Sequence, residues 1–99
     1  MSEKLRLGSI VVSKAGHDRG DLLMVAGIES GGEVLLLVDG KRRSAQKPKR
    51  KKFRHVFLTD GCCQKAAELL GHSKAIENAL VKRELKEYGN IHLKETGGC

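Results

Sequence analysis

The chain has 99 residues, with 19 Lys and Arg against 12 Asp and Glu, and a formal net charge of +7. This length provides one domain with a modest core, which favours a compact barrel or helical bundle over a layered α/β enzyme. One Tyr and two Phe are the only aromatic residues. They are too few for a surface on which several nucleic-acid bases stack on aromatic rings.

The excess positive charge is concentrated in one segment. Residues 41–54, called the basic run below, read KRRSAQKPKRKKFR and contain nine Lys or Arg and no acidic residue. The rest of the chain therefore has ten bases, 19 minus nine, against all 12 acids. This distribution indicates a polyanionic partner, either a nucleic acid or an anionic membrane surface.

Several features favour a cytoplasmic protein. No segment approaches the roughly 18–20 consecutive apolar residues of a membrane-spanning helix. The first residues lack the apolar stretch of a signal peptide. Three cysteines, with Cys62 and Cys63 adjacent, do not form a disulfide framework and fit a reducing compartment. We expect no membrane association.

Up to about residue 60, short apolar runs are separated by glycine-rich turns. Residues 10–12, 21–28 and 33–38 predict three strands, and Ser30-Gly31-Gly32 predicts a hairpin between the last two. Asp39-Gly40 predicts a type I′ turn that leads into a short strand at 41–43. Residues 54–58 predict a fifth strand. The pattern indicates a mainly β fold, a small antiparallel barrel over residues 7–60.

From residue 60 onward the apolar spacing becomes helical. Residues 66–70 predict a short helix that Gly71 ends, and Ser73 is the expected N-cap of a second helix. Gly89 is the expected end of that helix. We therefore predict a C-terminal helical extension over 61–89 and a flexible tail over 90–99. The apolar stripe of the second helix comprises Ile76, Leu80, Val81, Leu85 and Tyr88.

The loop KAGHDRG at residues 14–20 has two glycines, exposed amides and a positive rim. With its flanks, VVSKAGHDRGDLLMVAGI, and with VDG at 38–40, RR at 42–43 and HVFLTD at 55–60, it resembles the KOW motif. Residues 7–60 are similar to small KOW-bearing large-subunit ribosomal proteins of archaea and eukaryotes and to bacterial KOW-domain proteins. The resemblance implies an SH3-like barrel of the KOW type, followed here by two helices outside the motif.

The resemblance also implies roles for three residues of this loop. Gly20 corresponds to the loop glycine of the motif, and Lys14 and Arg19 correspond to contacts with the RNA backbone. The chain departs from the KOW pattern at Asp21, where a basic residue is favoured, and near Leu23, where a second glycine is favoured. These departures shift the expected affinity toward the basic run.

The basic run is the main candidate for RNA binding. Like charges around Pro48 disfavour a strand or a buried helix, so we expect an exposed, extended loop. Nine bases without an acid need an external counter-charge, and phosphates provide one without sequence readout. Arg42, Arg43 and Arg54 are the expected bidentate phosphate contacts. The other expected contacts are Lys41, Lys47, Lys49, Arg50, Lys51 and Lys52.

We predict no catalytic residue, no metal site and no cofactor. Adjacent Cys62 and Cys63 do not match the paired spacing of structural zinc ligands. The chain has no P-loop, no dinucleotide fingerprint and no paired carboxylates in a recognisable frame. The two cysteines do stand at a predicted helix N-terminus, where the pKa of a thiol can be lowered. A binding module is expected rather than an enzyme.

The leading interpretation is an RNA-binding protein, with ribosomal RNA as the main partner and ribosomal or translation-associated proteins as further ones. One alternative is a protein-interaction module that uses the barrel edge or the C-terminal helix. A second is adhesion to an anionic membrane, which the scarcity of apolar neighbours around the basic run disfavours. The segment KPKRKK also resembles a nuclear localisation signal.

Overall fold

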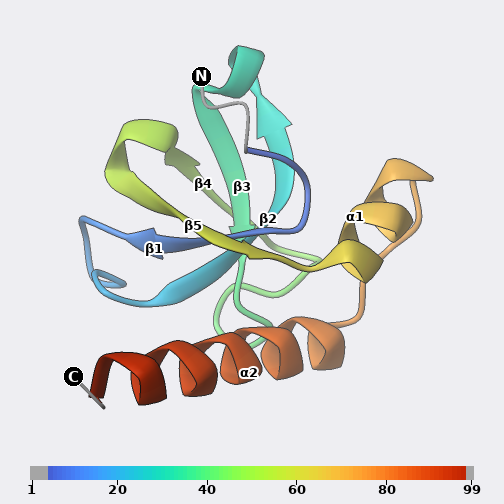
Figure 1. The fold of residues 1–99 in the computed structure, drawn as a ribbon. Coiled ribbons are helices and arrows are strands. Elements are labelled where there is room, and N and C mark those ends of the chain that lie inside the picture. The colour runs from blue at the N-terminus through green and yellow to red at the C-terminus, as the bar shows by residue number, and fades with distance from the viewer. Residues whose placement is uncertain (1–4, 98–99) are drawn as a thin grey trace.

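The computed structural model describes residues 5–97, with side chains up to residue 90, and has five strands followed by two helices (Figure 1). The strands are β1 (Ser9–Ser13), β2 (Leu22–Glu29), β3 (Val34–Val38), β4 (Lys49–Lys52) and β5 (Val56–Cys62). The 3₁₀ turns η1 (Ser30–Gly32) and η2 (Phe53–His55) join β2 to β3 and β4 to β5. The helices are α1 (Gln64–Gly71) and α2 (Asn78–Gly97). The predicted mainly β fold with two C-terminal helices is confirmed.

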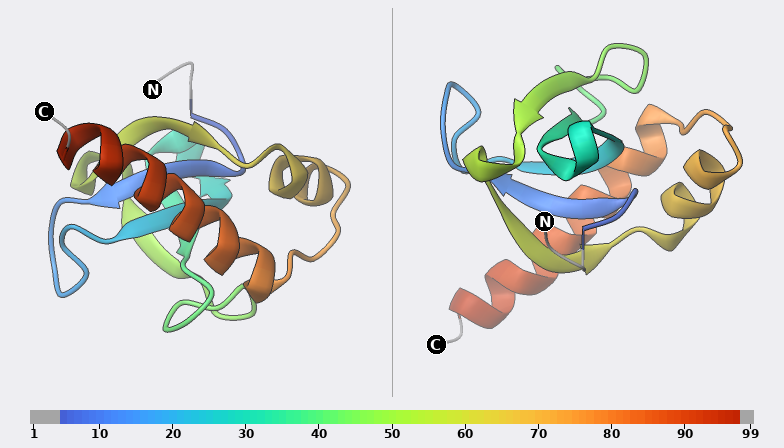
Figure 2. Two further views of the ribbon diagram at one scale, coloured as in Figure 1. Left: turned by 60° about the horizontal axis from the view of Figure 1, so that its bottom comes forward. Right: turned by 90° about the horizontal axis from the view of Figure 1, so that it is seen from above.

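All strand pairs are antiparallel, in the order β4-β3-β2-β1-β5. The register shifts between Ser9 and Val11 in β1 and between Val25 and Gly27 in β2. Such irregularities bend a strand and increase its twist. The sheet accordingly curls into a barrel-like shape, which is visible in the view from above (Figure 2).

Two apolar cores lie on opposite faces of this sheet. Side chains alternate between the faces of a strand, so Val11 and Leu23 enter one core while their neighbours Ile10 and Met24 enter the other. The first core is enclosed by the strands. The second lies between the sheet and the helices. Besides those four residues, the two cores contain Val25, Leu35, Leu37 and Val56 in the first and Val38, Ala66, Leu80, Val81 and Leu85 in the second.

Helix α2 runs obliquely across the outer face of the sheet (Figure 2). Its Leu80, Val81 and Leu85 are at most 8% exposed, and Ile76, just before the helix, is 3% exposed. The predicted apolar stripe is therefore confirmed, and it packs against the sheet of the same chain. This packing leaves the stripe unavailable to a protein partner.

The predicted ends of the second helix are wrong. It begins at Asn78 and not after Ser73, which has a positive φ of 58°. It also continues through Gly89 to Gly97, so residues 90–97, expected to be a tail, are helical. A Cβ at Gly89 would lie 3.3 Å from Leu22 Cδ1, so the absence of a side chain serves close packing rather than helix termination. Residues 98–99 lie outside the described part.

Two strand predictions also need correction. Residues 41–43 form a bend rather than a strand, and β4 comes later, at Lys49–Lys52. Gly40 has a positive φ of 80°, but Asp39 lacks the positive φ that a type I′ turn requires. The last strand also begins at Val56 and not at residue 54, because the preceding residues form η2. The predicted hairpin at Ser30–Gly32 is confirmed as η1.

Candidate nucleic-acid interface

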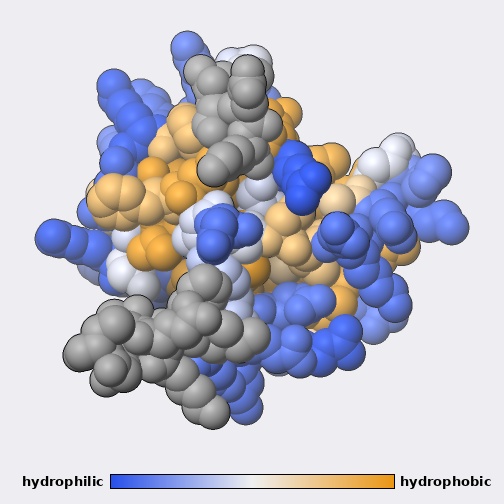
Figure 3. Space-filling view, viewed as in Figure 1, coloured by the Kyte–Doolittle hydropathy of each residue, from blue (hydrophilic) through white to orange (hydrophobic). Residues whose placement is uncertain are grey.

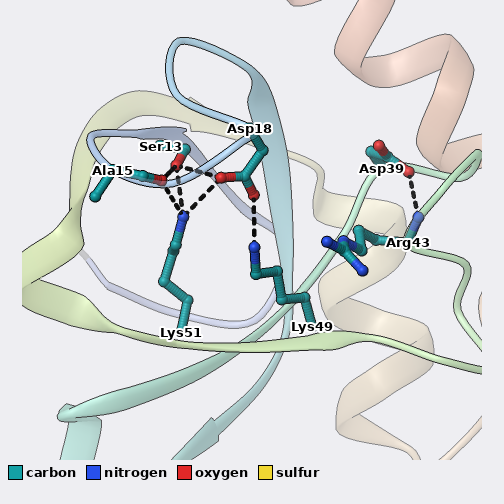
Figure 4. A network of polar contacts seen from close by, with 7 residues as sticks. All are labelled: Ser13, Ala15, Asp18, Asp39, Arg43, Lys49 and Lys51. Carbon is teal, nitrogen blue, oxygen red and sulfur yellow. Dashed lines mark hydrogen bonds and ion pairs between the residues drawn. The ribbon is translucent and has the colours of Figure 1, made fainter.

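Strand β4 directs two lysines of the basic run inward. Lys49 pairs with Leu37 and Lys51 with Leu35, and both leucines are fully buried. Directly paired residues share one face of a sheet. Lys49 and Lys51 therefore point toward the loop between β1 and β2 (Figure 4).

The ammonium group of Lys51 is fully satisfied inside the fold. Its Nζ donates hydrogen bonds to Ser13 Oγ at 2.6 Å, to the carbonyl of Ala15 at 2.7 Å and to Asp18 Oδ1 at 2.7 Å. A lysine has three donors, and all three are used here. Lys51 is 8% exposed. This side chain ties β4 to the β1–β2 loop.

Asp18 receives charge from both lysines. Its Oδ1 also accepts a hydrogen bond from Ser13 Oγ at 2.8 Å, and its Oδ2 lies 3.5 Å from Lys49 Nζ. Burial raises the pKa of Asp18, but hydrogen bonds from Lys51 and Ser13 and the charges of Lys51 and Lys49 outweigh it and lower the pKa to about 2. Asp18 is therefore a carboxylate at neutral pH and a counter-charge for β4.

The prediction that residues 47–52 form an exposed, extended loop is wrong for β4. The basic run contains no acid, but the fold brings acids to it from other strands. The two inward lysines are paired with Asp18, and Arg50 is paired with Glu29. Arg50 Nε lies 2.9 Å from Glu29 Oε1, and its Nη2 donates to Glu29 Oε2 at 3.3 Å. Three of the nine bases are thus neutralised internally, which the local sequence does not reveal.

The remaining bases of the run differ in exposure. Arg43 is half-buried, and its amide donates to Asp39 Oδ1 at 2.9 Å (Figure 4). The others are exposed and have no ion-pair partner among residues 5–90. They are Lys41, Arg42, Lys47, Lys52 and Arg54. These five are the part of the basic run that faces solvent with unneutralised charge.

The KOW-like loop presents side chains rather than amides. Gly20 has a positive φ of 89°, but its amide donates to Ser13 O at 2.8 Å and the amide of Asp21 donates to Asp18 O at 2.9 Å. The expected exposed amides at these two positions are therefore already used. Arg19 is exposed, and Lys14 Nζ lies 4.4 Å from the ring centre of Phe57, a cation–π distance.

A groove of about 740 Å³ lies beside the start of the basic run. Lys41 and Arg42 line it from the bend after β3, and Lys82 and Lys86 line it from α2. The sequence did not reveal that these two helix lysines approach the basic run. Their four-residue spacing, which puts both on one side of a helix, is the only local signal.

Cys63 has a structural role. It is the N-cap of α1, where its Sγ accepts a hydrogen bond from the amide of Ala66 at 3.4 Å and donates to Glu84 Oε1 at 3.5 Å. Burial is the main cause that raises the pKa of the Cys63 thiol. The expected lowering at the helix N-terminus is therefore wrong for Cys63. Within the described residues, no three His, Cys, Asp or Glu side chains are grouped so as to hold a metal ion.

Exposed apolar surface is limited. Figure 3 shows hydrophilic side chains projecting around the periphery of one face, with apolar residues reaching the surface between them. Among the described residues, the exposed large hydrophobic side chains are Ile28, 37% exposed, and Phe57, 60% exposed. No helix in the described part of the chain has the length and apolarity needed to span a bilayer.

This surface is suited to electrostatic binding of an extended anion. Among the described residues, Lys41 and Arg42 line the groove together with Lys82 and Lys86, while the exposed Lys52 and Arg54 lie at the other end of β3, near η1. No family model matches the chain, and no curated protein is similar to it at a significant level.

Proposed function

We propose that this protein is a non-catalytic RNA-binding protein that contacts the RNA backbone through the basic run. One observation carries the proposal: five bases of the run stay exposed and unpaired within the described residues, although the fold neutralises three others. Phosphates supply the missing counter-charge, and release of their condensed counterions drives binding without sequence readout. Structured ribosomal RNA, in the cytoplasm, is the proposed partner, with the protein a ribosomal component or an associated factor.

We also propose that the barrel is SH3-like and of the KOW type. The strand order supports this, because β1 to β4 form a meander and the last strand, β5, returns to pair with the first, β1. The resemblance of residues 7–60 to KOW-bearing ribosomal proteins adds independent support. Under this proposal the β1–β2 loop, with Lys14 and Arg19, assists the basic run.

The surface fits RNA better than the two other partners considered. A protein partner that added a strand to β4 would meet its exposed Arg50 and Lys52, and charges on an edge strand oppose such pairing. A partner that bound the apolar stripe of α2 would compete with the sheet. A membrane would need apolar side chains for insertion beside the basic run.

The test is the salt dependence of binding to a short structured RNA, measured by fluorescence anisotropy. If the five exposed bases each neutralise one duplex phosphate, log K falls with log salt at a slope of about −4.5. Replacing Lys47, Lys52 and Arg54 by Gln should reduce the magnitude of this slope by about 2.7. The matched control replaces three exposed bases outside the run, Lys65, Lys74 and Arg83, and should leave the slope nearly unchanged.

A wild-type slope near zero, or equal losses in the two triple variants, would contradict the proposal. Sedimentation supplies a second readout: we expect the wild type to co-sediment with ribosomal subunits at low salt and to dissociate as salt is raised. If the protein instead forms a stable, nuclease-resistant complex with one protein partner, the interaction-module interpretation replaces this one.

A further inference from the structure

The bend after β3, at residues 39–43, is held in place by its own hydrogen bonds. Asp39 Oδ1 accepts from the amides of Lys41 at 2.8 Å and Arg43 at 2.9 Å, and the amide of Asp39 donates to Arg43 O at 2.8 Å. Lys41 and Arg42 therefore start from a fixed backbone. Such pre-organisation lowers the entropy lost when side chains bind a ligand.

The same segment is docked onto the start of α2. Asn78 Oδ1 accepts a hydrogen bond from the amide of Ala45 at 2.7 Å, and Asn78 Nδ2 donates to Gln46 Oε1 at 3.0 Å. Gly40 packs directly on the helix, since a Cβ there would lie 2.6 Å from Asn78 O and 2.8 Å from Lys82 Cγ. The first part of the basic run and the first turns of α2 thus form one unit.

This unit places cations on both sides of the groove. Lys41 and Arg42 face it from the bend, and Lys82 and Lys86 face it from α2, where a spacing of four residues separates them by about 6 Å along the helix axis. Asp21 and Asp39 also line the groove, and one oxygen of Asp39 is occupied by amides. The lining side chains therefore carry two more positive than negative charges.

Like charges four residues apart on a helix repel each other, and Asp21 and Asp39 offset only two of the four cations that line the groove, so a bound anion would relieve the remaining repulsion. A single small anion could reach only part of this set. A nucleic-acid strand presents successive phosphates at a separation similar to one helical turn, so it can engage cations on both sides of the groove.

We propose that α2 forms the second half of the RNA site: backbone phosphates bind in the groove, with Lys82 and Lys86 on one side and Lys41 and Arg42 on the other. The inference rests on the proposed function and extends it from a basic run to a composite site. It also assigns a role to the helix that follows the barrel. The recognised feature is the phosphate backbone, not the base sequence.

The experiment compares two double variants with the same loss of charge on intact protein. Lys82→Gln with Lys86→Gln removes the helix side of the groove, whereas Lys74→Gln with Arg83→Gln removes two exposed bases outside it. For a short RNA duplex titrated at several salt concentrations, we expect the groove variant to reduce the magnitude of the slope by about 1.8 and the control to change it little. Circular dichroism checks that both variants are folded.

A second variant tests the geometry without removing a charge. Asn78→Ala deletes both side-chain hydrogen bonds between the basic run and α2. The bend is then no longer held at a fixed position relative to the helix. We expect weaker RNA binding, by about 3–10-fold, at an unchanged salt slope.

The outcomes separate this inference from the proposed function. If the wild type binds no RNA, the proposed function fails. Suppose instead that the wild type binds RNA and that the triple variant of Lys47, Lys52 and Arg54 binds it more weakly. If the groove variant then binds like its control, only the composite site fails. If poly-glutamate displaces the RNA at equal charge concentration with the same dependence on Lys82 and Lys86, the groove is a site for acidic proteins and the inference is overturned.

Discussion

Two regions of the basic run, the bend after β3 and the strand β4, have similar compositions and different roles. In β4, Lys49 and Lys51 bind Asp18, and Arg50 binds Glu29. In the bend, which is fixed against α2, Lys41 and Arg42 are exposed. The comparison shows that a lysine in a polybasic segment becomes structural when an acid from another strand reaches it. Composition alone does not distinguish the two cases.

The largest expected effect of a single substitution is at Lys51. Lys51→Met leaves the buried carboxylate of Asp18 without its main partner, and removing one member of a buried ion pair costs about 3–5 kcal/mol. Its neighbour Lys52 is exposed, and Lys52→Met should change the free energy of unfolding by less than about 0.5 kcal/mol. Urea denaturation measures both values.

The same two variants should reverse their order in RNA binding. Lys52→Met removes an exposed cation and should weaken binding, while Lys51→Met should have little effect wherever the protein is still folded. Equal destabilisation by the two substitutions would show that Lys51 is not buried and paired as described. Equal loss of RNA affinity would show that both lysines face the RNA.

Stability should also depend on pH through Asp18. The pKa of Asp18 is lowered in the folded protein to about 2, from 3.8 for an ordinary aspartate. A lowered folded-state pKa contributes stability that is present above about pH 4 and is lost as the pH falls toward 2; the shift corresponds to about 2 kcal/mol. Chemical denaturation at pH 7, 4 and 2.5 measures this loss.

The matched variant for this prediction is Asp18→Asn, which cannot titrate. Its free energy of unfolding should be lower than that of the wild type at pH 7. The difference in this free energy between the two proteins should narrow as the pH falls from 4 to 2. A constant difference over this range would show that another group is responsible for the acid sensitivity.

Features with a local cause could be predicted from the sequence. Alternating and β-branched apolar residues located β1, β2 and β3, the Ser30-Gly31-Gly32 segment located the hairpin, and the apolar stripe of α2 identified its buried face. Strand β4 could not be predicted in this way, because it depends on Asp18, which is 33 residues from Lys51 in the chain. The end of α2 was mispredicted because Gly89 does not end the helix but packs closely against Leu22 of β2, where an added Cβ would lie 3.3 Å from Leu22 Cδ1.

The sequence predicted one part of the candidate site, the basic run, but not the groove beside it. Its location on the basic run was inferred from charge, and five of the nine bases are in fact exposed and unpaired among the described residues. The groove was missed because Lys82 lies about forty positions away from Lys41 in the chain. Contacts of Gly40, Ala45 and Gln46 with the first turns of α2 bring these segments together, and contacts of this kind have no signature in the local sequence.

The smallest expected effect is that of Glu29→Gln. This substitution tests whether Arg50, once freed from its ion pair, becomes available to bind RNA. Arg50 and Glu29 are 69% and 41% exposed, so their ion pair contributes less than about 1 kcal/mol to stability. Glu29→Gln should therefore barely change the free energy of unfolding, but it frees Arg50 for a phosphate. The magnitude of the salt slope for RNA binding should then rise by at most about 0.9.

Glu33→Gln is the control for this last effect, because Glu33 is an exposed acid near the same hairpin and has no ion pair with any residue in the described range. Both substitutions raise the net charge by one, so a general electrostatic effect would be equal in the two variants. A steeper slope in Glu29→Gln alone would show that internal acids determine which bases of the run are available to RNA. An equal slope in the two variants would show that Arg50, though paired with Glu29, already contacts the RNA or lies too far from it.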